Sequence, residues 1–517
     1  MVDAISRVVK LQVENDDKPI QNIQIVYAVS KYTNFQYIFM KTAADQIKES
    51  QELNWKSQIE KPIETLNFSF FMGKSKDLFY GEQGIQLEQQ ITNIRNLFKQ
   101  GYYFSYTYNL SLSKQKQAFK AATEWRFAWN SHMCKDLITA KVNPLWTIPV
   151  VQGFVSNFQV YMLVARVKKQ GLVIMQEVAL SFNVQNILQK NYFSLKGLDE
   201  EGNVANYNEI EQIIYFNQYC CSHLQIRGSV PIFWQQTGIT ASCQITKPFE
   251  LTNSSFLKHF EDIKKNYNYV ICVNLMAKYK PSEQLITEGY EAHIKNNNLN
   301  YVKYKYFDFH DICKNEQYEQ VNPKIRELHS FNRNFLYYME DISTRTVFLA
   351  QKGLFRTNCL DCLDRTNVFQ SKIALDILIV QLEGLGANLE DEFGEDPLDH
   401  IDKSKKGQCD AFTQKFKEIW ANCGDMISKH YTGTGSTHTD VTRDGTRTFA
   451  GLIQHGQTTL NRFYLYNFED HLKQQTIDLV LGQKTDFSYI QEENQQIYQC
   501  NDDNYKFPQE QSKQIKS

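Results

Sequence analysis

The sequence predicts an α/β protein, or α+β when the whole chain is considered. Short β-branched or aromatic runs dominate the first third of the chain, whereas beyond about residue 183 apolar strands alternate with longer helical segments. Hydrophobic residues make up 42% of the sequence and charged residues 22%, and these values are typical of a globular chain that buries a sizeable core.

The first part of the chain holds most of the expected strands. They are apolar or aromatic runs bounded by polar residues, at 23–30, 35–40, 68–73, 102–110, 158–167 and 172–182. One helix interrupts them at 87–98, where apolar residues recur four, three and four positions apart and Gly101 follows as a stop. No comparable helix separates the last two runs, so we expect these to pair as an antiparallel sheet.

The second part of the chain alternates strands such as 269–277 and 304–310 with helices, which is typical of a parallel or mixed sheet. We therefore place a domain boundary near residue 182, giving domains at 1–182 and 183–489. Within the second domain, 389–408 is acidic and then basic and is expected to form a surface insertion. The polar, Gln-rich segment 490–517 is expected to be poorly ordered.

Charge and cysteine usage exclude several classes of protein. Subtracting 58 acidic from 56 basic residues leaves a net charge of −2, which argues against a protein that coats nucleic-acid phosphates with positive charge. We expect no membrane-spanning helix, because no apolar run reaches about 18 residues, and no secretory signal. The eleven cysteines are odd in number and scattered, which indicates reduced thiols in a cytosolic protein.

The most informative stretch is RTNCLDCLDRTN at 356–367. An expected strand at 346–350, a polar turn and GLF precede it. The helix that follows is predicted by Val368, Ile373, Ile377 and Val380, which lie near one helix face. Cys359 therefore lies where a strand passes into a helix N-terminus, and five residues separate it from Arg365.

This arrangement suits phosphoryl transfer. Backbone N–H groups curled toward an anion, together with the helix dipole, lower the pKa of a thiol at Cys359. The planar fork of Arg365 can hold two phosphoryl oxygens at once. Attack by the thiolate on phosphorus would give a phosphocysteine that water then hydrolyses, and the Thr366 hydroxyl is placed to donate a hydrogen bond to the sulfur.

Other interpretations of these residues remain open. Cys-x5-Arg-Thr is a weak pattern by itself, and buried, unreactive cysteines would also account for it. The spacing of Cys359 and Cys362 matches half of a zinc site, although no second pair of ligands accompanies them. The same spacing matches a redox-active cysteine pair, but the two carboxylates in the loop would oppose a stabilised thiolate there. The dense packing of charged and nucleophilic residues over 356–366 favours phosphotransfer.

RTNCLDCLDRTN resembles the signature of the Sac domain phosphoinositide phosphatases. The resemblance extends in collinear order over residues 20–482, through blocks at 102–111, 127–133, 145–155, 202–213, 225–236, 306–313, 420–448 and 462–482. It implies an N-terminal β-rich subdomain packed on an α/β catalytic subdomain with a phosphate loop at 359–365. It also implies hydrolysis of a phosphate monoester on the inositol ring of a membrane phosphoinositide.

The resemblance assigns roles to the residues of the loop. The family nucleophile corresponds to Cys359 and the phosphate-binding arginine to Arg365, with Thr366 beside the sulfur. Asp361 is our first choice of general acid, because a nearby phosphate dianion favours its protonated form, and Asp364 is the second choice or a structural residue. Cys362 either packs or forms a reversible disulfide with Cys359. The expected substrate-binding residues are Arg356, Asn358, Leu360, Cys362, Leu363 and Asp364.

We therefore expect a metal-independent enzyme without a cofactor. The favoured substrate is a phosphoinositide with a phosphate at ring position 4, and the next is one with a phosphate at position 3. The alternatives are a protein tyrosine or dual-specificity phosphatase and a non-catalytic phosphoinositide-binding scaffold. We expect a phosphoinositide at a membrane surface as partner, no nucleic acid, and a recruiting protein of unknown identity. The expected location is peripheral, on the cytosolic face of endoplasmic reticulum or Golgi membranes. Segment 181–202 has no arginine where relatives carry several, and Asp444 replaces a basic residue, so attraction to anionic bilayers should be weak.

Overall fold

The chain forms two compact units, Met1–Gln51 with Gln475–Ser517, and Glu52–Gln474. In the first unit the described residues form an antiparallel pair, β1 (Val29–Ser30) and β2 (Phe35–Gln36). The second unit contains all other elements discussed below. The computed structural model describes residues 29–30, 35–36, 101–105, 108–144, 147–164, 174–186, 196–237, 242–314, 318–386, 398, 411–437 and 439–444.

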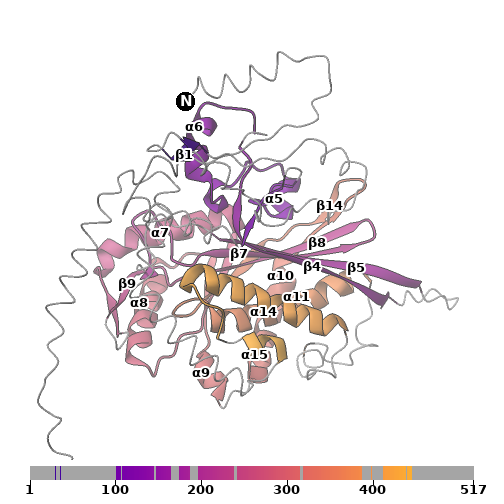
Figure 1. The fold of residues 1–517 in the computed structure, drawn as a ribbon. Coiled ribbons are helices and arrows are strands. Elements are labelled where there is room, and N and C mark those ends of the chain that lie inside the picture. Colours follow the sequence, from indigo (N-terminus) through magenta and orange to yellow (C-terminus); the bar gives the residue numbers. More distant parts are fainter. Residues whose placement is uncertain are drawn as a thin grey trace, which may run out of the picture. The chain divides into compact units, whose positions relative to one another are not determined.

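A ten-stranded mixed sheet organises the second unit (Figure 1). Its central order is β12-β11-β15-β8-β7-β5-β4-β3, and β13 joins it by pairing with β8 and with β14. The strands are β3 (Tyr102–Tyr103), β4 (Val151–Val164), β5 (Ile174–Asn186), β7 (Asn208–Phe216), β8 (Tyr219–Arg227), β11 (Tyr269–Asn274), β12 (Val302–Tyr306), β13 (Tyr338–Asp341), β14 (Thr346–Leu349) and β15 (Gly353–Asn358). A separate antiparallel sheet contains β6 (Lys196–Gly197), β9 (Phe233–Thr237) and β10 (Ser242–Ile245).

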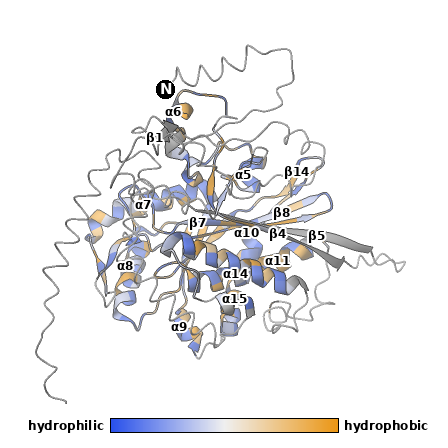
Figure 2. Cartoon of the chain, in the orientation of Figure 1, coloured by the Kyte–Doolittle hydropathy of each residue, from blue (hydrophilic) through white to orange (hydrophobic). Residues whose placement is uncertain are grey.

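Helices cover both faces of the parallel part of the sheet, and Figure 2 shows that α8, α11 and α14 carry both hydrophilic and hydrophobic residues. The α-helices are α5 (Lys114–Ala118), α6 (Ser131–Thr139), α7 (Phe249–Tyr267), α8 (Pro281–Asn297), α9 (Phe309–Ile312), α10 (Asn322–Phe335), α11 (Asp364–Gly384), α14 (Ala411–Thr432) and α15 (Thr439–Asp444). Two short 3₁₀ helices are η2 (Trp125–Phe127) and η5 (Tyr318–Val321).

The inner parallel strands β11 and β15 are buried on both faces, whereas β12 at the edge of the sheet is only partly buried. In β11, Val270 and Cys272 face a core formed with α7 and α8, whereas Ile271 and Val273 face a second core formed with α10, α11 and α14. This alternation follows from the two-residue period of a strand. It explains why residues 270–273 of β11 are all apolar, without the polar alternation of a half-exposed strand.

β15 occupies the middle of the parallel strands, and all six of its residues are buried. It pairs in parallel with β11 over its whole length and with the end of β8. The Leu275 N–H donates to the Asn358 carbonyl oxygen over 2.9 Å, which extends the pairing to the last residue of β15. The chain leaves the sheet at Cys359, turns, and enters α11 at Asp364. The predicted strand at 346–350 forms β14, and the predicted passage from a strand into a helix N-terminus at Cys359 is confirmed, although the strand that ends there is β15.

Several other sequence predictions are confirmed. The described residues of the runs at 158–167 and 172–182 lie in the antiparallel pair of β4 and β5, and residues 269–274 of the run at 269–277 form β11. The sheet is mixed, as expected, but among the described residues the alternation of strand and helix begins only at α7, because β6 to β10 come one after another before it. The expected domain boundary near residue 182 falls inside β5, which pairs with both β4 and β7. The division of the chain at that residue stays a prediction.

Two predicted strands are wrong in part, because local side-chain hydrogen bonds replace strand pairing. Among the described residues of the run at 102–110, Tyr102–Tyr103 form a strand; further along, the Asn109 side chain accepts hydrogen bonds from the Ser111 N–H and hydroxyl. In the run at 304–310 the strand ends at Tyr306. The Asp308 carboxylate then accepts from the Asp311 N–H and begins α9.

Some predictions lie outside the described residues. They are the strand at 68–73, the helix at 87–98, the insertion at 389–408 apart from Leu398, and the segment at 490–517. Of the runs at 23–30 and 35–40, only the residues of β1 and β2 are described. In the part of the chain that is described, no helix combines the length and apolarity needed to cross a bilayer.

Replacing Phe355 of β15 by alanine should lower the free energy of unfolding by about 3–5 kcal/mol, because the side chain is fully buried and leaves a cavity. Phe348→Ala is the matched control, since Phe348 is 52% exposed on β14, and its cost should stay within about 1 kcal/mol. Urea denaturation of the two variants measures both values. Equal losses would contradict the central position assigned to β15.

Candidate active site

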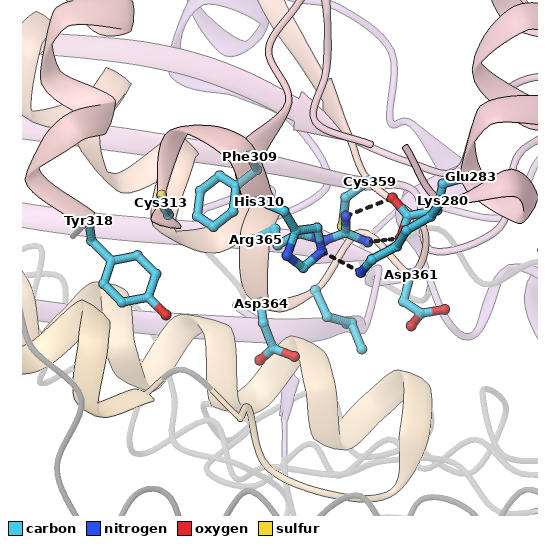
Figure 3. A pocket seen from close by; sticks show the side chains of 11 residues that line it. Lys280, Glu283, Phe309, His310, Cys313, Tyr318, Cys359, Asp361, Asp364 and Arg365 are labelled. Atoms are coloured by element: carbon cyan, nitrogen blue, oxygen red, sulfur yellow. Dashed lines mark hydrogen bonds and ion pairs between the residues drawn. The ribbon is translucent and has the colours of Figure 1, made fainter. Parts of the chain in front are cut away.

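A cavity of about 240 Å³ opens beside the end of β15 (Figure 3). Residues from three regions far apart in the sequence meet there: the start of α8, the segment from α9 to η5, and the loop between β15 and α11. The lining residues are Lys280, Glu283, Phe309, His310, Cys313, Tyr318, Cys359, Asp361, Leu363, Asp364 and Arg365. Parallel pairing explains the gathering, because the carboxyl ends of β11, β12 and β15 lie at one edge of the sheet.

The loop that begins at Cys359 is tightly curled. Cys362 adopts a left-handed conformation, with φ of 55°, which is strained for a residue with a side chain. Its thiol donates to the Cys359 carbonyl oxygen across the turn, at 3.4 Å. The Asn206 side-chain amide donates to the carbonyl oxygens of Asp361 and Cys362, at 2.8 and 3.3 Å. These contacts fix the backbone from outside the loop.

Cys359 carries the lowered thiol pKa that the sequence predicts. Burial raises the pKa, but hydrogen bonding from Cys362, the positive charge of Arg365 and the neighbouring Thr366 hydroxyl outweigh it and lower the pKa to about 6. Cys313 lines the same cavity, yet burial raises its pKa to about 12. The cavity therefore contains one cysteine with a lowered pKa and one with a raised pKa, and the surroundings of the loop account for the difference.

Arg365 is held at the cavity by Glu283. Its Nη1 and Nη2 atoms donate to the two carboxylate oxygens of Glu283, at 2.9 and 3.2 Å. Glu283 is buried and also accepts from the Ala277 N–H at 2.7 Å. Burial raises the pKa of Glu283, but the Arg365 charge and these hydrogen bonds outweigh it, so the pKa lies below its usual value. Because Glu283 engages the end of the guanidinium, the edge that carries Nε is left for another ligand.

The two carboxyl groups of the loop have different surroundings. Asp361 forms an ion pair with Lys196, and its side chain is 40% exposed at the rim of the cavity. Asp364 instead accepts from the Ser436 hydroxyl at 2.5 Å and from the Thr437 N–H at 2.7 Å. Asp364 thus joins the start of α11 to the segment after α14, which is a structural task.

Not every residue expected at the site lines the cavity. Cys359, Asp361, Leu363, Asp364 and Arg365 do. Thr366 is buried, and its hydroxyl makes no hydrogen bond of standard geometry to the described residues. The substrate contacts expected for these residues stay predictions.

Four other residues expected to bind substrate lie away from the cavity lining. Arg356 is buried in β15, where it donates to His259 Nε2 at 3.1 Å and to the Ser229 carbonyl oxygen at 2.6 Å. Asn358 donates to the Asn274 side chain at 2.8 Å. The remaining two are Leu360, which packs against the core of α7 and α8, and Cys362, which is buried.

The sequence interpretation missed several residues that surround the loop. Lys280 and Glu283 belong to no motif, and His310 lies in a block quoted only for its resemblance. Arg227 is fully buried behind the loop, and its guanidinium donates to the side-chain oxygens of Gln370 at 2.8 Å and Asn367 at 3.0 Å. Its charge lies near the thiols of the loop, so it adds to the positive potential there.

The alternatives for the cysteine pair can be compared with the described residues. All the cysteines among them are free thiols, Cys359 and Cys362 included. Within those residues no three histidine, cysteine, aspartate or glutamate side chains gather as metal ligands. The described part of the chain therefore offers this pair no further zinc ligands.

Comparison with known proteins places this geometry in a family. The SacI homology domain profile matches residues 7–314, which is more than half of the chain. The chain belongs to the SacI homology domain family. The profile match ends before Cys359, but curated relatives align over about three quarters of the chain.

Three relatives of this SacI homology chain are phosphatases by name. The zebrafish (Danio rerio) phosphatidylinositide phosphatase SAC2 is 33% identical over 415 residues, covering 74% of this chain and 35% of the relative. The Arabidopsis thaliana phosphoinositide phosphatase SAC6 is 34% identical over 397 residues, covering 74% and 62%. The Drosophila melanogaster phosphatidylinositol-3-phosphatase SAC1 is 32% identical over 401 residues, covering 74% and 63%. The chain thus spans between about a third and three fifths of these relatives' length.

The thiol at Cys359 should react with iodoacetamide at a rate that rises between about pH 5 and pH 7 and then levels off, because its pKa is about 6 and the thiolate is the nucleophile. Cys313 is the internal control, since it lines the same cavity with a pKa raised to about 12 and should be labelled slowly throughout. Mass spectrometry of the two peptides measures both rates. Labelling of Cys359 that starts only above about pH 8 would show an ordinary thiol.

Proposed function

We propose that this chain is a phosphoinositide phosphatase that removes a phosphate monoester from the inositol ring through a phosphocysteine intermediate. One observation carries the proposal: a thiol with a pKa of about 6 lines a cavity beside a guanidinium held by a buried carboxylate. A thiolate nucleophile and a fixed planar fork are what phosphoryl transfer to cysteine requires.

In the first step, the Cys359 thiolate attacks phosphorus as the bond between phosphorus and the ring oxygen breaks. Arg365 and the loop N–H groups stabilise the charge that develops on the equatorial oxygens. The ring oxygen leaves as an alkoxide and needs a proton, which Asp361 donates from the rim of the cavity. Lys196 favours the ionised form of Asp361, whereas the incoming phosphate dianion favours the protonated form.

In the second step, water attacks the phosphocysteine. Asp361, now a carboxylate, accepts the proton from this water, the bond between sulfur and phosphorus breaks, and inorganic phosphate leaves. The electron pair of that bond returns to Cys359 as a thiolate, and the buried Thr366 hydroxyl can donate to the sulfur as the charge forms. This step restores the starting protonation states.

The names of the relatives support a phosphoinositide as the substrate class. For the ring position we propose the 4-phosphate first and the 3-phosphate next; the Drosophila relative is named a 3-phosphatase, which supports the second. We infer a peripheral position on the cytosolic face of endoplasmic reticulum or Golgi membranes, where the lipid is presented by the bilayer or by a recruiting protein.

Phosphate release from a panel of short-chain phosphoinositides tests the function. The wild-type chain should hydrolyse the 4-phosphate fastest, with and without chelator, and Cys359→Ser should abolish release because a serine hydroxyl is not ionised at neutral pH. Cys362→Ser is the matched control, because a serine hydroxyl can still donate a hydrogen bond at this position of the loop, so release should fall far less than for Cys359→Ser. Release from a phosphotyrosine peptide alone would support a tyrosine phosphatase, and binding without release would support a scaffold.

Asp361→Asn should lower kcat on a phosphoinositide by roughly 10²–10⁴-fold, because the leaving alkoxide then lacks its proton donor. On p-nitrophenyl phosphate, whose leaving group needs no proton, the formation of phosphocysteine should be affected far less. Asp364→Asn is the comparison, since it should chiefly weaken the contact with Ser436 and Thr437 and lower thermal stability. If Asp361→Asn slowed the formation of phosphocysteine equally on both substrates, Asp361 would not be the acid.

A further inference from the structure

A second cation, Lys280, lines the cavity and lies near Glu283, whose pKa its charge helps to lower. Lys280 immediately precedes α8, and its ammonium group forms no ion pair with a carboxylate in the described part of the chain. Its hydrogen-bond partner is His310 of α9, whose Nε2 lies 3.1 Å from Lys280 Nζ (Figure 3). A lysine that lines a cavity and is held by a neutral group is a candidate to bind an anion.

His310 stays neutral in this contact. An ammonium group can only donate, so Nε2 accepts, and the ring proton lies on Nδ1. Burial lowers the pKa of His310 to about 4, and the charges of Arg365 and Lys280 contribute to this lowering. His310 thus orients the ammonium group without neutralising its charge.

The nearby carboxylates are already engaged elsewhere. Glu283 holds both ends of the Arg365 fork. Asp308 accepts from the Tyr306 hydroxyl at 3.1 Å and from the Lys278 N–H at 3.2 Å. Asp311 forms an ion pair with Lys314. The positive charge of Lys280 therefore remains available to a ligand in the cavity.

We propose that Lys280, oriented by His310, binds a second anionic group of the substrate, distinct from the phosphate that Cys359 attacks. The inference rests on the proposed function, in which Arg365 and the loop hold the reacting phosphate. The second anion is a phosphate ester, either another monoester on the ring or the diester that joins the ring to the lipid. Lys280 is then a specificity-determining residue, because a substrate with one phosphate ester gains nothing from it.

Steady-state kinetics of Lys280→Gln on three soluble substrates test this role. The substrates are inositol monophosphate, a short-chain phosphatidylinositol monophosphate and a short-chain phosphatidylinositol bisphosphate, which carry one, two and three phosphate groups. For substrates with the second anion, KM should rise about tenfold, as expected for loss of about 1.4 kcal/mol of binding, with a smaller change in kcat. For inositol monophosphate the rise in KM should be several-fold smaller. Lys280→Arg should retain most of the wild-type KM.

Lys278→Gln is the matched control. Lys278 lies two residues away in the same segment and carries the same charge, but it pairs with Glu291 at 2.8 Å and does not line the cavity. An increase in KM equal to that of Lys280→Gln would show a general charge effect and overturn the proposal. A Lys280→Gln effect that is equal on all three substrates would show that Lys280 binds the attacked phosphate, and would also overturn it.

The substrate on which the effect first appears identifies the second anion. An effect on the monophosphorylated lipid points to the diester, and an effect on the bisphosphate alone points to a second ring phosphate; either supports the proposal. If the wild-type chain hydrolyses none of the three, the proposed function fails, and binding still tests the subsite. Calorimetry in the Cys359→Ser background should then show tighter binding of inositol bisphosphate than of monophosphate. Lys280→Gln should abolish that preference, and an unchanged preference would overturn the proposal.

Discussion

The position of β15 between β11 and β8 is the constraint on which the rest of the site depends. All its residues are buried, and parallel pairing on both sides leaves the strand little freedom to shift. The chain must therefore leave the sheet at Cys359, at the edge where β11 and β12 also end, and it enters α11 five residues later at Asp364. The Cys359 sulfur is therefore surrounded by backbone donors, a helix N-terminus and side chains from three regions. They meet there because parallel strands end at the same edge of the sheet.

Each cation around this sulfur is held by a different kind of partner, and the partner decides what the charge can do. Glu283 pairs with Arg365 and fixes its direction. Neutral amides hold the buried Arg227, whose charge acts on the thiols of Cys359 and Cys362 and on the Asp364 carboxylate of the loop. A neutral imidazole holds Lys280 at the cavity. The three positive charges thus have different roles. Arg365 is fixed in one direction, Arg227 helps to stabilise the thiolate, and Lys280 can bind an anion.

Local sequence patterns predicted the strand, loop and helix around Cys359 well, since apolar spacing and the polar loop between them depend on nearby residues. These patterns predicted strands less reliably where the hydrogen bonds of a polar side chain compete with the pairing between strands. The aromatic run at 102–110 has strand composition, yet the Asn109 side chain turns the backbone. The run at 304–310 ends early because Asp308 begins a helix. Such competition follows from one polar side chain, which a pattern of apolar residues does not register.

The sequence by itself determined the mixed class of the fold and the closeness of Cys359, Asp361 and Arg365, because these residues are joined by a few bonds of one loop. The surroundings of this loop were decided by the tertiary structure alone. It brought Glu283, Lys280 and His310 to that loop from two other strand ends, and it turned Arg356 away to His259, although Arg356 is only three residues from Cys359. Strand alternation sets the direction of a side chain, and sheet order sets its neighbours, and both are settled only when distant strands pair.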